Sequence, residues 1–453
     1  MPQENKKKER VKKMIKFGKW VVKFRIPILI LSFLLLIPTG IIYMNTRINY
    51  DILSYLPGDI ETMKGQDILL DEFGTGAFSV AVIDGMQEKE ISQLEDKLKE
   101  IDHVKDVLWY GALADISIPM DMLPDDLKDS LQNADTGSQL MIITFDTSMS
   151  ADETLDAIEE IRGLTNEQCL LSGMSAVVTD IKKICNSEVI MYVVIAAGLS
   201  ALVLALTMDS FLLPFIFLLS IGMAIVYNLG TNFIAGEISF VTQALAAVLQ
   251  LAVTMDYSIF LWHSYLENQE RYPDDKKRAM SHAISQTLTS VVGSSITTIA
   301  GFLAMCFMTF TLGMDLGIVM AKGVVFGVVG CVTILPAMIL AMDKWIEKTR
   351  HKAIIPDLGR IGGFVTKHYW IFIILFLVII GPAFYGQNHN QVYYDLVGTL
   401  PDNLESVKAG NALENDFDMG ATHVILASSE LNSKDARNME NEISDVDLSL
   451  IHI

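Results

Sequence analysis

Long apolar runs alternate with polar segments along this chain. Six of the runs can cross a bilayer unaided, because a spanning helix needs about 17–25 predominantly apolar residues. A seventh run has 16 residues and becomes long enough with its flanks. The pattern therefore predicts a polytopic α-helical membrane protein with seven spans, which are 26–44, 189–206, 211–229, 240–262, 288–308, 316–342 and 370–385.

The polar segment 45–188, between the first two spans, has the pattern of an α+β domain. Its apolar, β-branched stretches predict strands at 78–83, 104–110, 139–145 and 169–171. Helical spacing of apolar residues predicts helices at 90–101 and 151–161. Ser150 and Glu153 have the form of a capping box at the start of the second helix. Strand, helix and strand thus occur twice, which predicts a split βαβ, ferredoxin-like fold.

The chain also aligns on itself at an offset of 344 residues. Ile48–Gly76 lies over Val392–Gly420 without a gap, and nine of these 29 positions are identical. The same offset places Pro38 on Pro382, so the preceding spanning helix is included. Both copies have the same expected orientation, which predicts a parallel repeat about an axis along the membrane normal. The second copy stops within its outer domain, so we expect a chain truncated at its C-terminus.

Charge sets the expected orientation. Residues 1–25 hold ten Lys and Arg against two Glu, which predicts a cytoplasmic N-terminus. Residues 45–188 carry 29 acidic and 10 basic side chains, and residues 387–453 carry 12 and 3, so both outer segments are acidic. Such charge argues against nucleic acid as a partner.

The expected parts of the chain are a basic terminus (1–25), a first span (26–44), an outer porter domain (45–188), a helical bundle (189–342), a cytoplasmic linker (343–369), a seventh span (370–386) and the start of a second porter domain (387–453).

One acid interrupts the fourth span. Asp256 lies beside Tyr257 in a run that is otherwise apolar, and a charged group at that depth is costly and usually functional. On a helix, Gln250, Thr254, Tyr257 and Leu261 share one face, with Asp256 about 100° away.

This arrangement predicts a proton relay formed by Asp256 and Tyr257. Burial favours the neutral carboxylic acid, whereas a tyrosine hydroxyl can donate a hydrogen bond to the charged form. A group balanced in this way can load a proton from one side and release it to the other. The alternative is that Asp256 only joins two helices by hydrogen bonds. The expected supporting side chains are Gln250, Thr254, Ser294 and Thr298.

Small residues in the next two spans predict close helix contacts. The first stripe consists of Ser290, Ser294, Thr297, Thr298 and Gly301. The second is the GxxxG pair Gly323 and Gly327. Lys322 lies next to Gly323. Its ammonium group can either extend to the membrane surface or form an ion pair with Asp256.

Sequence motifs for enzyme chemistry are missing. The chain has no GxxxxGK[ST] loop, no HExxH and no GxSxG, so we expect no catalytic residue, no metal and no cofactor. The four cysteines have no metal-ligand spacing, and a Cys169–Cys185 disulfide is left open. Because no nucleotide-binding motif is found and an acid lies in the membrane, a proton gradient is the simplest energy source for transport.

Several motifs resemble those of MMPL-type transporters, within the resistance–nodulation–division (RND) superfamily. They are Thr254–Leu261 (TMDYSIFL), Tyr50-Asp51 with Leu56-Pro57, Gly173-Met-Ser175, and Gly313–Pro336. The resemblance implies a proton-driven exporter of lipids or other hydrophobic molecules in the plasma membrane. It also implies outer porter domains that handle substrate, and a second Asp-Tyr pair on a tenth helix. This chain departs from the pattern because it has no tenth helix.

Two alternatives stay open at this stage. The chain can belong to a non-transporting membrane component, such as an accessory to protein export or a sterol-sensor-like regulator. It can serve multidrug efflux instead of lipid export. Its expected partners are protons and membrane lipids or hydrophobic small molecules, with a homo-oligomer as a further option.

Overall fold

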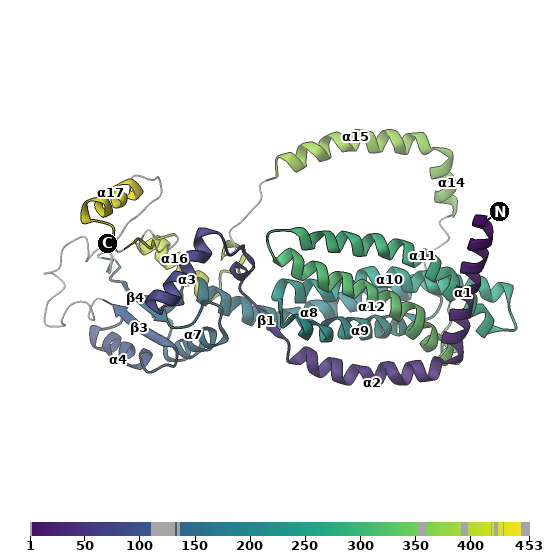
Figure 1. The fold of residues 1–453 in the computed structure, drawn as a ribbon, viewed down its shortest axis with the longest axis horizontal. Coiled ribbons are helices and arrows are strands. Elements are labelled where there is room, and N and C mark those ends of the chain that lie inside the picture. The colour runs from purple at the N-terminus through teal and green to yellow at the C-terminus, as the bar shows by residue number, and fades with distance from the viewer. Residues whose placement is uncertain are drawn as a thin grey trace. The chain divides into compact units, whose positions relative to one another are not determined.

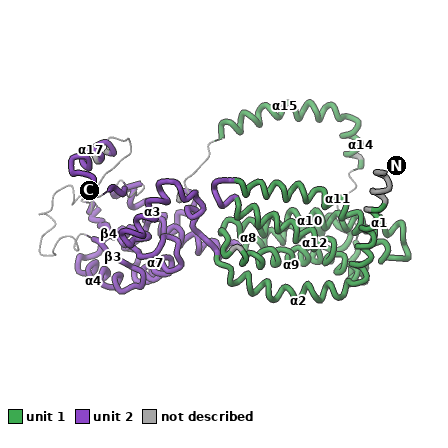
Figure 2. Tube along the Cα trace, in the orientation of Figure 1, with its two compact units in different colours: residues 1–47, 190–307, 314–395 green, residues 48–189, 308–313, 396–453 purple. Residues whose placement is uncertain are grey.

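A computed structural model of the chain describes residues 2–109, 132–133, 136–351, 359–390, 397–417, 419–420, 425–428 and 430–444. The chain forms two compact units, which are coloured separately in Figure 2. The helical unit consists of residues 1–47, 190–307 and 314–395, and the α+β unit of residues 48–189, 308–313 and 396–453. Each unit has a hydrophobic core of its own.

Seven described helices are long and apolar enough to cross a membrane, which is the number that the apolar runs predict. In chain order they are α2 (Arg25–Met44), α8 (Met174–Thr207), α9 (Leu213–Gly230, continued by η3, Thr231–Ala235), α10 (Phe240–Arg271), α11 (Lys276–Ala304, continued by η4, Met305–Phe307), α12 (Leu312–Ala341) and α15 (Tyr369–Asn388). Several helices extend past their apolar runs. α8, for example, begins at Met174, because no Gly or Pro interrupts the polar residues before its span.

Glycines set the spacing between neighbouring helices of the helical unit. The basic N-terminus forms α1 (Pro2–Lys23), and its Gly18 lies against the backbone of Ser281 in α11. Gly230 at the end of α9 lies in the same way against the backbone of Thr39 in α2. A side chain at either glycine would force two backbones apart. The helices α9 and α11 each lie beside α10 (Figure 1), and Gly323 and Gly327 bring α12 close to α10. Shorter elements complete this part of the chain. They are β1 (Arg47–Asn49), β6 (Glu237–Ser239), α13 (Asp343–Lys348) and α14 (Gly359–Lys367).

The α+β unit is built on a four-stranded sheet with the order β3-β4-β2-β5, in which every neighbouring pair is antiparallel. Its elements in chain order are β2 (Ala77–Ile83), α4 (Glu88–Leu98), β3 (Val104–Trp109), β4 (Gln139–Phe145), α7 (Asp152–Leu164) and β5 (Cys169–Ser172). This is the split βαβ arrangement that the sequence predicts. Apolar residues of α4 and α7 pack on one face of the sheet, and this core includes Ile83, Ile91, Leu98, Trp109, Ile143, Phe145, Ile158 and Ile161.

A helix from the far end of the chain covers part of the other face. Leu413 and Phe417 of α16 (Glu405–Phe417) pack against Val80, Val82 and Leu140 of the sheet. Successive side chains of a strand point to opposite faces of the sheet. Val80 and Val82 therefore point to this face, and Ala81 between them points to the other. The remaining described elements of this unit are η1 (Leu53–Tyr55), α3 (Glu61–Phe73), η5 (Val397–Thr399) and α17 (Ser433–Ser444).

Three pairs of elements have bounds that differ by 344 residues at both ends. The pairs are α2 with α15, η1 with η5, and α3 with α16. Their burial differs, because α16 has five buried side chains whereas α3 has none. Every side chain of α15 is likewise exposed.

One local expectation was wrong, and one open question is answered. The predicted capping box at Ser150 is absent, because α7 begins after Ala151 and the Ser150 hydroxyl instead donates to Asp51 Oδ2 at 3.1 Å. The capping box of this unit is found on α4, between Gln87 and Glu90. Cys169 and Cys185 are both free, so the disulfide left open by the sequence does not form.

Candidate functional site

The candidate site lies on α10, whose N-terminus is fixed by two polar side chains. The Ser239 hydroxyl accepts a hydrogen bond from the Val241 backbone N–H at 3.2 Å, which caps the helix. The Asp315 carboxylate on α12 accepts from the Ser239 backbone N–H at 2.9 Å and from the Thr242 hydroxyl at 2.5 Å. A carboxylate at a helix N-terminus is also favoured by the helix dipole. These bonds position α10 within the bundle.

One face of α10 is buried in the helical unit. It carries Gln250, Thr254, Tyr257 and Leu261, which are the four residues that helical periodicity places on one side. Tyr257 is 7% exposed and lies in the core of the helical unit. Its backbone carbonyl accepts a hydrogen bond from the Cys331 thiol of α12 at 3.2 Å. The tyrosine is therefore part of the contact between α10 and α12.

Asp256 lies on a different side of the same helix. It is exposed, and so are five other residues that continue its stripe along α10, namely Leu245, Leu249, Ala252, Phe260 and His263. Within the described part of the chain, Asp256 makes no hydrogen bond and no ion pair. The structure thus brings Tyr257, Gln250 and Thr254 together and leaves Asp256 apart from them, as the 100° step between adjacent helical residues requires.

The hydroxyl residues predicted to support the relay lie on α11. Ser294 is exposed and Thr298 is half-buried. The Thr298 hydroxyl donates to the Ser294 backbone carbonyl at 3.2 Å, so it is used within its own helix. Neither residue bonds to Asp256 in the described structure. Lys322 does not pair with Asp256 in the described structure, because its ammonium group donates to Asn232 Oδ1 of η3.

The glycines predicted at helix contacts behave in two ways. A Cβ at Gly323 would lie 2.7 Å from Asn228 Nδ2 and 2.9 Å from Gln250 Oε1, and one at Gly327 would lie 2.5 Å from Thr254 Oγ1. Both glycines therefore let α12 approach α10 closely. Gly301 differs, since a Cβ there would meet nothing within 4 Å among the described residues.

Sequence reasoning missed two buried asparagines of the third span, Asn228 in α9, which contacts Gln250, and Asn232 in η3. Asn228 and Asn232 are both buried, and Asn228 Nδ2 donates to Gln250 Oε1 at 2.9 Å. The signal was available, because Asn228 interrupts the apolar run 211–229 just as Asp256 interrupts 240–262. A buried amide inside a spanning helix needs a partner, so it marks a helix contact.

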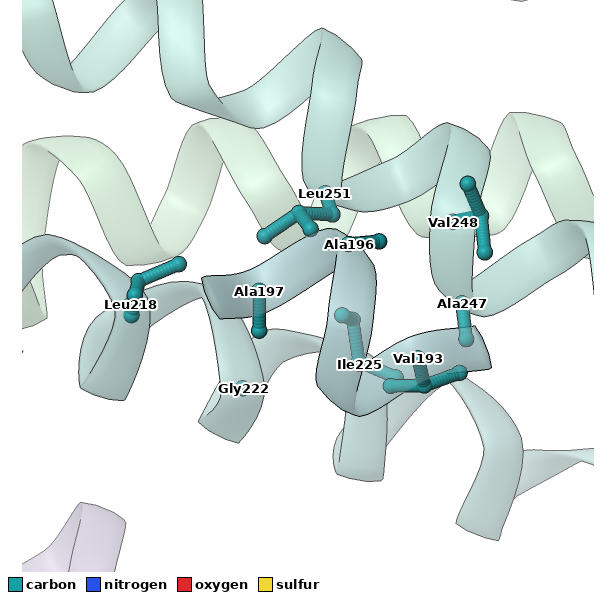
Figure 3. Close-up of a pocket in the computed structure, with 9 residues that line it drawn as sticks. All are labelled: Val193, Ala196, Ala197, Leu218, Gly222, Ile225, Ala247, Val248 and Leu251. Carbon is teal, nitrogen blue, oxygen red and sulfur yellow. The ribbon is translucent and has the colours of Figure 1, made fainter. Parts of the chain in front are cut away.

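An apolar pocket of about 110 Å³ lies between α8, α9 and α10. Figure 3 shows its lining side chains, which are Val193, Ala196, Ala197, Leu218, Gly222, Ile225, Ala247, Val248 and Leu251. All of these residues are apolar, so the pocket suits hydrocarbon rather than a polar group.

A second polar cluster, in the α+β unit, joins elements that lie far apart in the sequence. Arg162 at the end of α7 donates two hydrogen bonds to Asp180 of α8, at 2.7 and 3.1 Å. Its Nε lies 3.2 Å from Glu405 Oε2 of α16, an ion-pair contact. The carboxylates also accept from backbone N–H groups, Asp180 from Ser406 and Glu405 from Leu171, each at 3.2 Å. The cluster therefore fixes the N-terminus of α16 against α8 and β5.

The chain matches known proteins in three comparisons. The model of a family described as "MMPL family" matches residues 74–368. The "Probable transport protein MmpL12" of Mycobacterium tuberculosis is 24% identical over 370 residues, which cover 78% of this chain and 30% of that protein. The "Apo-petrobactin exporter" of Bacillus anthracis is 20% identical over 418 residues, which cover 81% of this chain and 55% of that protein. Among solved structures, "Crystal structure of SecDF in Super-membrane-facing form" matches with a TM-score of 0.39 and 14% identity, covering 72% of this chain and 39% of that one. The chain thus spans about a third to a half of the length of these relatives.

Proposed function

Because this chain belongs to the MMPL family of the RND superfamily, a family of transport proteins, we propose that it is part of a proton-driven exporter. Its substrate would be a lipid or another hydrophobic or amphipathic molecule, moved out of the plasma membrane. The observation that carries this proposal is the position of Asp256, a carboxyl group in the middle of a span and on the open side of its helix. A charged group there is costly in a bilayer and is usually functional.

The chemistry follows from the two charge states of Asp256. The protonated acid is neutral, so its stripe on α10 can pack against an apolar surface. The carboxylate needs water or hydrogen-bond donors, so the same stripe then favours a polar surface. Loading and releasing one proton therefore changes which surface the α10 stripe prefers, and a bundle that alternates between the two couples proton flow to a change of shape.

Tyr257 has a positioning role in this mechanism. Its ring is buried in the core, and its carbonyl is bonded to Cys331, so it holds α10 in place from a face about 100° away from the open stripe. We propose that Gln250 and Thr254 do the same through their contacts with α12 at Gly323 and Gly327.

We further propose that the chain carries a parallel internal repeat. The nine identities at an offset of 344 support this proposal, as do the equal offsets at both ends of α2 and α15, η1 and η5, and α3 and α16. Both copies then run from a cytoplasmic helix into an outer domain, with the N-terminus inside, as the basic residues 1–25 favour. The α+β unit is the part we expect to handle the substrate outside the membrane.

The test is transport by the full-length protein carrying Asp256→Asn, which keeps the shape of the side chain and removes its charge. We expect loss of both substrate export from cells and proton flux in proteoliposomes that contain a pH-sensitive dye. The matched control is Asp256→Glu, which keeps a carboxyl group and should retain part of both activities. Export at the parent rate by Asp256→Asn would refute the relay. Absence of proton flux in the parent protein, together with a co-purifying partner protein, would favour an accessory or regulatory role instead.

A further inference from the structure

Four buried polar atoms at the contact of α9, α10 and α12 lack a hydrogen-bond partner in the described structure. They are Asn228 Oδ1, Asn232 Nδ2, Gln250 Nε2 and Thr254 Oγ1. All four residues are at most 3% exposed. Buried polar groups in native proteins are nearly always bonded to protein or to ordered water, so four unpaired atoms at one helix contact require an explanation.

Rotation of the amide groups cannot pair these atoms. Lys322 donates to Asn232 Oδ1, and because an ammonium group only donates, the Asn232 amide must keep its N–H₂ end free. Asn228 and Gln250 share one hydrogen bond, and if both amides were reversed they would still share one. Either way, this pair keeps one free donor and one free acceptor.

The unpaired atoms belong to two pairs of side chains that are close in sequence. Gln250 and Thr254 are four residues apart on α10, and Asn228 and Asn232 are four residues apart on α9 and η3. Side chains at this spacing on a helix are about 5–6 Å apart at their Cβ atoms. In each pair one atom is a donor, and its partner can accept.

The chemistry of the site selects the ligand. A cation would be bound by the Asn228 and Thr254 oxygens but repelled by the free N–H groups and by the ammonium group of Lys322. An anion would be bound by those N–H groups and attracted by Lys322, but it would leave Asn228 Oδ1 without the donor that this oxygen needs. Water both donates and accepts, so it satisfies all four atoms.

We propose that two buried water molecules occupy this contact, one bridging Gln250 and Thr254 and the other bridging Asn228 and Asn232. They form a hydration site within the membrane-spanning bundle, with Lys322 at one end and Thr254 at the other. The site lies on the buried face of α10, away from the open stripe of Asp256, and it does not depend on the proposed proton coupling.

The direction in which one substitution changes the melting temperature tests the proposal. Thr254→Val keeps the shape of the side chain and removes its hydroxyl. If the hydroxyl binds water, the change should lower the melting temperature of the full-length protein in lipid nanodiscs by about 2 °C or more. If the hydroxyl is dry and unpaired, the change removes a destabilising polar atom and raises the melting temperature. The matched control is Thr333→Val on α12, because the Thr333 hydroxyl bonds only to the Val329 carbonyl of its own helix, and we expect little change there.

A melting temperature of Thr254→Val that is unchanged or higher would overturn the proposal. A direct readout completes the test, namely a density map of the full-length protein at a resolution that shows ordered solvent. Two density peaks within hydrogen-bond distance of these residues would support the proposal, and a dry contact in such a map would also overturn it.

Discussion

Replacing Arg162 with methionine gives the sharpest test of how the α+β unit is held together. Methionine keeps most of the apolar stem of arginine and removes its charge. The Arg162 side chain is 13% exposed and that of Asp180 is 5%, so Arg162→Met would leave a buried carboxylate without its cation. Glu405 would lose the same partner.

The expected loss is large because the pair is buried. Removing one partner of a buried ion pair typically costs about 3–5 kcal/mol. We expect a value near the lower limit, about 3 kcal/mol, since Asp180 and Glu405 each keep one hydrogen bond from a backbone N–H. For a unit of this size that corresponds to a fall in melting temperature of roughly 6–12 °C.

The assay is thermal unfolding of the full-length protein, with limited proteolysis to follow α16. Cleavage near α16 should become faster in Arg162→Met, because Arg162 and Asp180 contact the N-terminal residues Glu405 and Ser406 of that helix. A second change, Asp180→Leu, should recover part of the stability by removing the unpaired charge.

The control is Arg271→Met, which removes an ion pair with Glu267 in which both side chains are 57% exposed. Exposed pairs contribute about 0–1 kcal/mol, so the melting temperature should hardly change. Equal melting temperatures for Arg162→Met and the parent protein would show that the cluster does not stabilise this unit.

Two further predictions concern other contacts. Gly327→Ala should destabilise the helical unit by about 1–3 kcal/mol through overpacking against Thr254. Gly301→Ala should be neutral or should stabilise the unit by about 0.5–1 kcal/mol. Denaturation of both variants measures the two changes, and equal losses of stability would contradict this prediction. Burial, with a smaller contribution from the charge of Glu405, raises the pKa of the Cys169 thiol from 9.0 to about 12. We therefore expect no maleimide labelling of Cys169 at pH 8 until the protein is unfolded, and a loss of stability as the pH rises from 9 towards 12 that is smaller in Cys169→Ala; rapid native labelling would contradict the buried position.

The elements were predictable where one periodicity dominates. A bilayer fixes the length of a spanning helix, so the apolar runs alone give seven spans. Period 2 in segments such as Gln139–Phe145 predicts the strands, and their order with two helices leads to the split βαβ fold. Within α10, the 3.6-residue period correctly groups Gln250, Thr254 and Tyr257 on one face.

Contacts between distant segments were not predictable in this way. Helical periodicity gives the angle between Asp256 and Tyr257 but does not say which of them faces the core. The partner of Lys322 is Asn232, on a different element, and nothing in the local pattern indicates it. Arg162 and Glu405 are more than two hundred positions apart, and ion pairs at such separations depend on how the elements pack.

The outward position of Asp256 also has a consequence for the biogenesis of this protein. An aspartate at the centre of a helix opposes insertion by about 2.5–3.5 kcal/mol, which the apolar residues around it must outweigh when the translocon releases α10 into the bilayer. Once inserted, a carboxyl group on an exposed stripe needs a proton, water or a further protein surface to cover it. Until that happens, the newly made chain would be open to degradation by membrane proteases, as a misfolded membrane protein is. The speed of assembly would therefore govern how much of the protein accumulates in a cell.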